Sequence, residues 1–237
     1  AVLSVRGDII AVSGQRGTIR FRNARTGRTV GQPIITHHAV TGLALSPDGK
    51  LVAAIGTDGK ARLWSVATQQ PTGIAVAVGQ ARDALAFSPD GKTFVTVGAN
   101  GTAALWSVAT GHRVGALMSA GAAVSPGRAA VAATFSPDGR ILATAVDGSI
   151  RLWDTATRQQ IGTPMTAGPD PLDAVGFSPD GRTLATADGD GTVRSWDVAF
   201  PAGLLAGACA IADQSLTRQQ WASYAGTQPF QRVCPAS

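Results

Sequence analysis

The chain has 237 residues, of which 44% are hydrophobic and 15% are charged. These proportions exclude a disordered chain, and no apolar run approaches the roughly 18 residues that predict a membrane-spanning helix. The formal net charge is +5 and all 15 acidic residues are aspartate, a turn residue, so the composition favours short strands and many turns over helices.

The first part of the chain carries the whole net charge. Residues 1–28 contain six arginines and one acidic residue, and the remainder has equal numbers of bases and acids. Arg20 and Arg22 alternate with apolar residues, so a strand here would place both on one face. We predict a basic patch of Arg20, Arg22, Arg25 and Arg28. The patch is interpreted either as a solvated surface or as a site for nucleic acid or an acidic protein.

A repeat of about 42 residues organises the chain up to residue 200. Ser-Pro-Asp-Gly occurs four times, beginning at Ser46, Ser88, Ser136 and Ser178. Apolar segments flank each copy, which predicts a tight turn between two strands because proline fixes φ and glycine adopts positive φ. A second turn follows at Asp58, Asn100, Asp147 and Asp190. The third strands carry Trp64, Trp106, Trp153 and Trp196.

A weaker fourth apolar segment closes each repeat, so each one predicts a four-stranded antiparallel sheet, the blade of a β-propeller. The first unit is degenerate, with Arg22 where the others have tryptophan. Five units can be counted. They predict an all-β propeller of five blades or, alternatively, the C-terminal part of a seven-bladed ring.

The motifs Phe-Ser-Pro-Asp-Gly, Asx-Gly and Leu-Trp-Asp (152–154) resemble those of the WD-repeat β-propeller family, over roughly residues 1–200. The resemblance implies a hydrogen-bonded set in each blade that joins the turn aspartate, a strand hydroxyl and a histidine. Thr96, Thr144 and Thr186 can supply the hydroxyl, and His37 alone falls near the histidine position.

The resemblance also implies that proteins or peptides bind at the loops between blades, where binding residues gather on a rigid scaffold. The Asx-Gly turns are expected at the same end of the blades. The candidate interaction residues in or beside these loops are His37, His38, Arg82, Asp83, Arg128, Asp170 and Asp173.

Residues 201–237 depart from the repeat and predict a short helical extension packed on the propeller. Its ending resembles that of propellers at the C-termini of large bacterial signalling proteins. Cys209 and Cys234 are either a disulfide or two buried thiols. We expect a cytoplasmic protein, or an extracellular one if the disulfide forms. The chain does not start with methionine, so we expect a covalently attached upstream domain.

No grouping of residues predicts an enzyme, a cofactor or a metal site. Nine aspartates occupy repeated turn positions, and the others form no pair typical of a glycosidase. We therefore predict a non-catalytic interaction or ligand-sensing module, the receptor part of a larger bacterial signalling protein. A glycan-binding propeller and nucleic-acid binding through the basic patch are the alternatives, and no membrane partner is expected.

Overall fold

The structure is a computed structural model that describes residues 3–14, 17–78, 84–98, 100–121, 131–168 and 172–198. By its contacts the chain divides into two units, Ala1–Asp197 and Val198–Ser237. The predicted helical extension lies outside the described residues, together with Cys209 and Cys234. Within the described ranges, no helix is long and apolar enough to cross a membrane.

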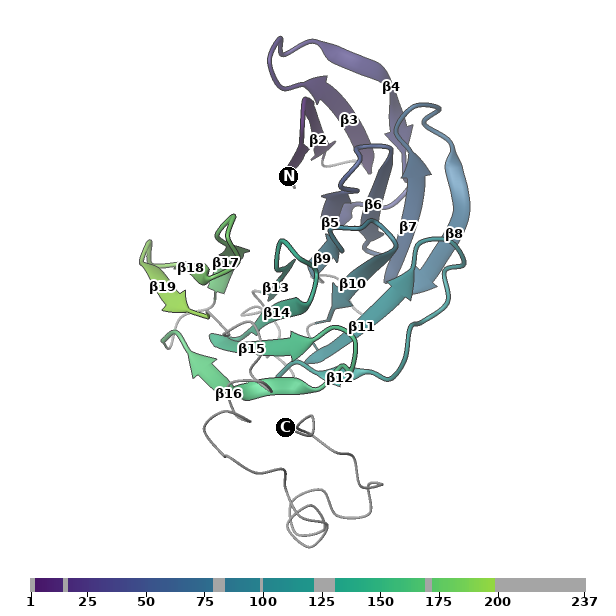
Figure 1. Cartoon of the computed structure of the whole chain (residues 1–237). Helices are drawn as coiled ribbons and strands as arrows, with labels where there is room; N and C mark the ends of the chain where they lie inside the picture. Colours follow the sequence, from purple (N-terminus) through teal and green to yellow (C-terminus); the bar gives the residue numbers. More distant parts are fainter. Residues whose placement is uncertain are drawn as a thin grey trace, which may run out of the picture. The chain divides into compact units, whose positions relative to one another are not determined.

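Five antiparallel sheets follow one another along the first unit (Figure 1), and the strands of each sheet pair in chain order. The first sheet contains β1 (Leu3–Arg6), β2 (Ile9–Gly14), β3 (Thr18–Asn23) and β4 (Thr29–Ile35). The second contains β5 (Val40–Leu45), β6 (Leu51–Gly56), β7 (Lys60–Ser65) and β8 (Pro71–Ala77). The third contains β9 (Ala84–Phe87), β10 (Thr93–Val97), β11 (Thr102–Ser107) and β12 (Met118–Ser119). The fourth contains β13 (Val131–Phe135), β14 (Ile141–Val146), β15 (Ser149–Asp154) and β16 (Gln160–Thr166). The fifth contains β17 (Leu172–Phe177), β18 (Thr183–Asp188) and β19 (Val193–Asp197).

Ser-Pro-Asp-Gly forms the same turn in the second to fifth sheets. In the second sheet the Ser46 hydroxyl donates to Asp48 Oδ1 at 2.6 Å, and the same oxygen accepts the Lys50 N–H at 3.0 Å. Gly49 has a φ of 68°, which glycine adopts without strain. The same serine–aspartate bond recurs at Ser88–Asp90, Ser136–Asp138 and Ser178–Asp180. These bonds use one oxygen of each aspartate within its own turn.

The turn aspartates should make the fold sensitive to acid. The serine hydroxyl in each turn, followed by backbone N–H donors, holds the pKa of Asp48, Asp90, Asp138 and Asp180 below its usual value. A carboxyl with a lowered pKa in the folded state stabilises the fold above its unfolded pKa, and this stabilisation is lost as the pH falls through the folded pKa. We expect the melting temperature to decrease when the pH is lowered below about 4. A Ser136→Ala variant should show a smaller acid-dependent drop, and an unchanged drop would contradict this cause.

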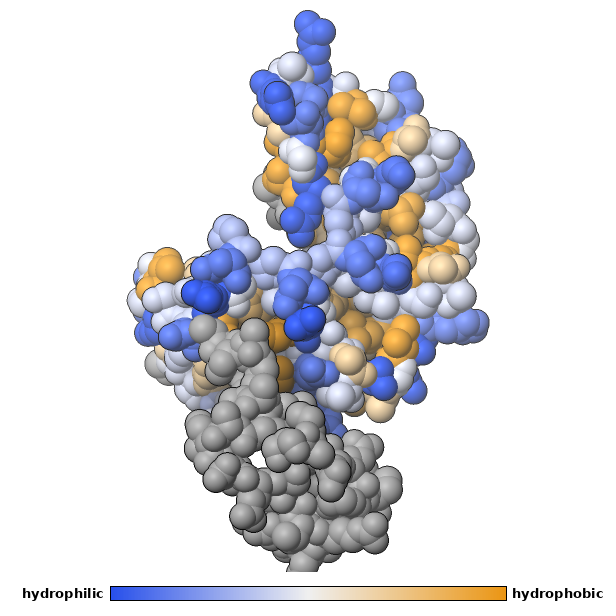
Figure 2. Space-filling view, in the orientation of Figure 1, coloured by the Kyte–Doolittle hydropathy of each residue, from blue (hydrophilic) through white to orange (hydrophobic). Residues whose placement is uncertain are grey.

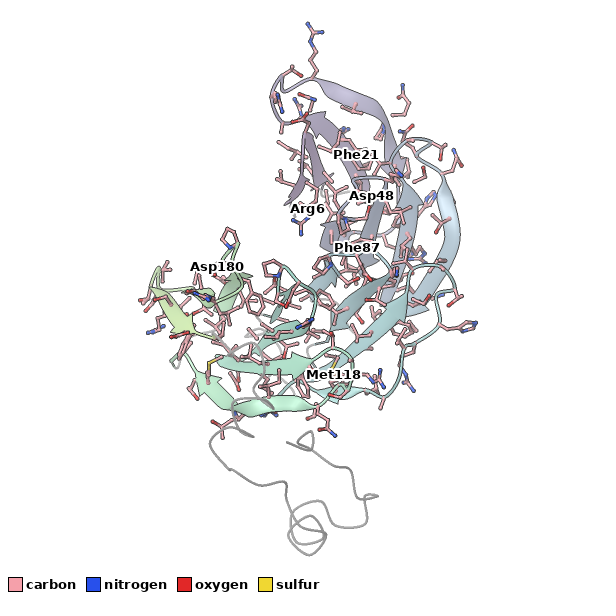
Figure 3. The ribbon with its side chains drawn as sticks, viewed as in Figure 1. Arg6, Phe21, Asp48, Phe87, Met118 and Asp180 are labelled. Atoms are coloured by element: carbon pink, nitrogen blue, oxygen red, sulfur yellow. The ribbon has the colours of Figure 1, made fainter. Side chains whose placement is uncertain are left out.

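Neighbouring sheets pack through two kinds of face. On the leucine face of a sheet, the third strand presents Leu63, Leu105 or Leu152, or Phe21 in the first sheet. The opposite face, the tryptophan face, presents Trp64 or the residue at its position in the other sheets. Phe21 and Trp64 share one buried cluster, and Leu105 and Trp153 share another. Figure 3 shows Phe21 and Phe87 between successive sheets. The core therefore consists of layers between sheets.

The two end faces of this array carry polar residues where the inner faces carry apolar ones. Arg22 pairs with Ile10 as Trp64 pairs with Val52, and Ser195 pairs with Ala185 as Leu152 pairs with Ala143. On the exposed leucine face of the fifth sheet, Val193 is 71% exposed, whereas Ile150 at the same position of the fourth sheet is 0% exposed. Both ends of the array are thus open to solvent.

Contacts between inner strands join β1 to β5, β5 to β9, β9 to β13 and β13 to β17. Figure 1 shows the resulting arc, open between the first and fifth sheets, with Arg6 and Asp180 on its two sides in Figure 3. The predicted all-β propeller fold is confirmed. The described sheets form part of a ring instead of the closed five-bladed ring that we expected as one alternative, because the two end faces do not pack together.

Candidate interaction surfaces

The loops between sheets begin beside the turns between the second and third strands, each of which contains a glycine. The residue after the fourth strand donates its N–H to the carbonyl of the turn glycine, as in Thr36 to Gly17 at 2.7 Å and Val78 to Gly59 at 2.9 Å. Ala120 and Ala167 make the equivalent bonds in the third and fourth sheets. One end of the arc, which we call the loop end, therefore carries both sets of connections, and the Ser-Pro-Asp-Gly turns lie at the other end.

Three of the predicted interaction residues lie within the described part of the chain. His37 is exposed and has a φ of 60°, a conformation uncommon outside glycine. His38 Nε2 lies 3.6 Å from Asp58 Oδ2, and Asp173 is exposed on β17. Arg82, Asp83, Arg128 and Asp170 lie outside the described residues. The role of all seven residues in binding stays a prediction.

The hydrogen-bonded set implied by the WD-repeat resemblance is divided between sheets. In the third, fourth and fifth sheets, the tryptophan Nε1 donates to a strand threonine at 2.9–3.1 Å: Trp106 to Thr96, Trp153 to Thr144 and Trp196 to Thr186. The second sheet has Ala54 at the threonine position, and there the aspartate–histidine half of the set occurs instead. The histidine that approaches Asp58 is His38, and the expectation for His37 was wrong by one residue.

Asp58 also binds an arginine that the sequence analysis missed. Arg62 donates to both carboxylate oxygens, at 3.1 and 2.6 Å. The Arg62 guanidinium holds the pKa of Asp58 below its usual value. An aspartate and an arginine four residues apart on either side of a tight hairpin turn are the signal that could have predicted this bidentate pair.

The other turn residues serve their own turns. Asn100 Oδ1 accepts the Thr102 N–H and hydroxyl at 3.1 and 2.8 Å. Asp190 Oδ1 accepts the Thr192 N–H at 2.7 Å, and these bonds from Thr192 lower the pKa of Asp190. Asp147 has a φ of 49°. Asn100 and Asp190 therefore shape the loop end through bonds within their own turns.

In the fourth and fifth sheets, an arginine on the tryptophan face lies near residues of the preceding sheet or its following loop. Arg151 Nη1 donates to the carbonyl of Ser119 in the third sheet at 3.2 Å. Arg194 pairs with the buried Asp188, and its guanidinium lies beside Gly168, which follows the last strand of the fourth sheet. Arg20 occupies the same position on the first sheet, where it is exposed. The Asp188–Arg194 pair had no counterpart in the sequence repeats and was missed.

The four arginines of the basic patch are exposed, and one of them is paired with an aspartate. Arg20 and Arg22 lie on one exposed face of β3, as predicted. Arg25 Nε lies 2.8 Å from Asp8 Oδ1, and Arg22 Nη1 donates to the Gly27 carbonyl at 3.0 Å. Figure 2 shows hydrophilic residues gathered where the first sheet has the turn between β3 and β4. Two of the four arginines therefore already hold partners within their own sheet.

Among the described residues, no group of three or more histidine, cysteine or acidic side chains could hold a metal ion. The model of one protein family, described as outer membrane protein assembly factor BamB, matches residues 1–200. No curated protein matches the sequence.

Many solved chains match the structure. One of them, from a crystal structure of a mitotic checkpoint complex, is 23% identical and superimposes with a TM-score of 0.71. The match covers 84% of this chain and 64% of that chain, so this chain spans less than two thirds of the length of that solved structure. At this identity the likeness establishes the fold.

Proposed function

Because this chain belongs to the family described as outer membrane protein assembly factor BamB, we propose that it is a non-catalytic β-propeller scaffold that binds a protein or peptide partner. The observation that carries the proposal is the loop end, where connections of several sheets gather on a rigid framework. The turn aspartates support it, because each carboxylate is bonded within its own turn.

The proposal has a finer part that rests on sequence resemblance. The WD-repeat motifs and the motif of residues 216–235 support a receptor or ligand-sensing domain of a larger bacterial signalling protein. Reduced cysteines would fit a cytoplasmic protein. A disulfide between Cys209 and Cys234 would fit an extracellular one, and titration of free thiols in the purified chain distinguishes the two.

The alternative partners are less well supported. The exposed large hydrophobic residues of the described part are Val5, Ile35, Leu117 and Val193, none of which is aromatic, whereas sugar rings stack on aromatic side chains. Nucleic acid would meet a patch in which Arg25 is already paired with Asp8. A protein or peptide partner at the loop end is therefore the function that the geometry favours.

Two aspartates of the fifth sheet provide a matched test. Asp173 lies at the loop end beside Gly189, and Asp180 lies in the Ser-Pro-Asp-Gly turn at the opposite end. Once a partner has been captured and identified, Asp173→Arg should weaken its binding by at least about tenfold, equivalent to roughly 1.4 kcal/mol. Asp180→Arg should leave the affinity unchanged. Failure to capture a partner, or equal binding by both variants, would overturn the proposal.

A further inference from the structure

A cleft of about 220 Å³ lies between the third and fourth sheets, at the end opposite the loop end. Its apolar wall consists of Leu105 on β11, Val114 and Phe135 on β13. Leu105 is 4% exposed and Phe135 is 8% exposed, so both form the floor. The cleft is smaller than the roughly 300–1,000 Å³ of pockets that enclose whole small-molecule ligands. Its size suits a single side chain.

The cleft lies beside the most irregular fourth strand of the described sheets. β8 and β16 have seven residues each, whereas β12 has two. Before β12 the chain makes only an isolated bridge between Trp106 and Arg113, followed by a bond from the Val114 N–H to the Leu105 carbonyl at 2.8 Å. Val114 thus lines a space that a regular fourth strand would border.

Two carboxylates stand at the mouth of the cleft. Asp90 and Asp138 occupy equivalent positions in successive Ser-Pro-Asp-Gly turns, and both line the cleft. Each uses Oδ1 for its own turn. Asp138 Oδ2 lies 3.9 Å from Arg140 Nε. No hydrogen bond to Oδ2 of Asp90 occurs in the described part of the chain, and the charge of Lys92 also acts on this carboxylate. Because the pKa of both carboxyls is lowered by bonds from the turns, both are charged at neutral pH.

We propose that this cleft receives a lysine or arginine side chain from the partner protein, in a second contact separate from the one at the loop end, and this proposal rests on the scaffold function proposed above. The hydrocarbon stem of such a side chain packs on Leu105, Val114 and Phe135, while its charged end lies between the two carboxylates. A cleft with an apolar floor and an acidic mouth is complementary to a residue with an apolar stem and a cationic tip. A neutral aliphatic side chain would match the floor alone.

The probe for a direct test is N-acetyl-lysine amide, with N-acetyl-norleucine amide as its uncharged analogue. Titration of the full chain, followed by NMR, should show the lysine probe binding at least about fivefold more tightly than the norleucine probe. Val114→Trp, which fills the cleft, should abolish the difference. Asp90→Asn and Asp138→Asn should each weaken lysine binding severalfold, and Arg140→Gln should strengthen it because it removes a competing cation.

The repeat supplies matched controls. Asp48→Asn and Asp180→Asn change the same turn in sheets where these residues do not line the cleft, so they should leave lysine binding unchanged. The asparagine variants keep the side-chain volume. If Val114→Trp fails to fold, their lysine binding alone shows whether the cleft binds the probe. Equal affinity for the two probes, or equal loss in all four asparagine variants, would overturn the inference.

A captured partner separates this inference from the scaffold function itself. If the partner binds the Val114→Trp and Asp90→Asn variants as tightly as the natural chain, the cleft is not its docking site and the inference is wrong, while the scaffold function stands. If no partner is captured, the scaffold function fails, and the inference about the partner fails with it.

Discussion

Replacing Trp153 by alanine should lower the free energy of unfolding by about 3–5 kcal/mol. The side chain is 5% exposed and lies with Leu105 and Phe135 in the buried cluster between the third and fourth sheets. Truncation leaves a cavity in this layer. It also removes the Nε1–H that donates to the hydroxyl of Thr144 at 2.9 Å, and Thr144 is completely buried. Urea unfolding followed by circular dichroism, with a check that the m-value is unchanged, measures the loss.

The second sheet offers a control for the hydrogen bond. Trp64 occupies the same position as Trp153, but its sheet has Ala54 where the fourth sheet has Thr144. Trp153→Phe should therefore cost about 1 kcal/mol more than Trp64→Phe, since only the former leaves a buried hydroxyl without its donor. Equal losses would mean that the indole–threonine bond contributes nothing to stability.

The repeated elements of the fold could be predicted because their causes are local. Proline and glycine at fixed places in Ser-Pro-Asp-Gly determine the turn, and alternation of Arg20 and Arg22 with Ile19 and Phe21 determines which face of β3 is buried. The WD-repeat resemblance is confirmed at the level of a β-propeller repeat protein. The narrower assignment to a signalling receptor stays a prediction.

The side-chain partners at the loop end could not be predicted in the same way. Which histidine reaches Asp58 depends on the backbone of the connection, where His37 has positive φ and His38 follows it toward the next sheet. Asp188 belongs to the aspartates for which the sequence predicted no partner, because Arg194 is separated from it by a turn. Such pairs depend on how strands are placed against each other, which residue types alone do not determine.

The exposure of the two end faces could not be predicted from the sequence either. The sequence interpretation of Arg22, at the tryptophan position of the first repeat, is degeneration of the motif. In the structure Arg22 takes the tryptophan position on one end face of the arc and Ser195 takes the leucine position on the other end face, and no described sheet covers either face. Apolar residues there would expose a large hydrophobic surface, so the substitutions are compatible with an open array.

The buried ion pair of the fifth sheet leads to the second large expected effect. The Asp188 side chain is 1% exposed, Arg194 is 36% exposed, and among the described residues no partner meets Asp188 Oδ1. Arg194→Met would leave a buried carboxylate without its countercharge, which should lower the free energy of unfolding by about 3 kcal/mol. Thermal and urea unfolding of the purified variant measure this loss.

The fourth sheet shows how the cost can be removed. β14 ends at Val146 where β18 ends at Asp188, so a valine is accommodated at this position of a neighbouring sheet. The double variant Asp188→Val/Arg194→Met should therefore recover most of the stability that Arg194→Met loses, because it removes the unpaired charge together with its partner. Asp188→Val alone should cost less than Arg194→Met, since the arginine that it leaves unpaired can reach water. If the double variant is as unstable as Arg194→Met, the loss comes from other contacts of the arginine side chain and not from the buried charge.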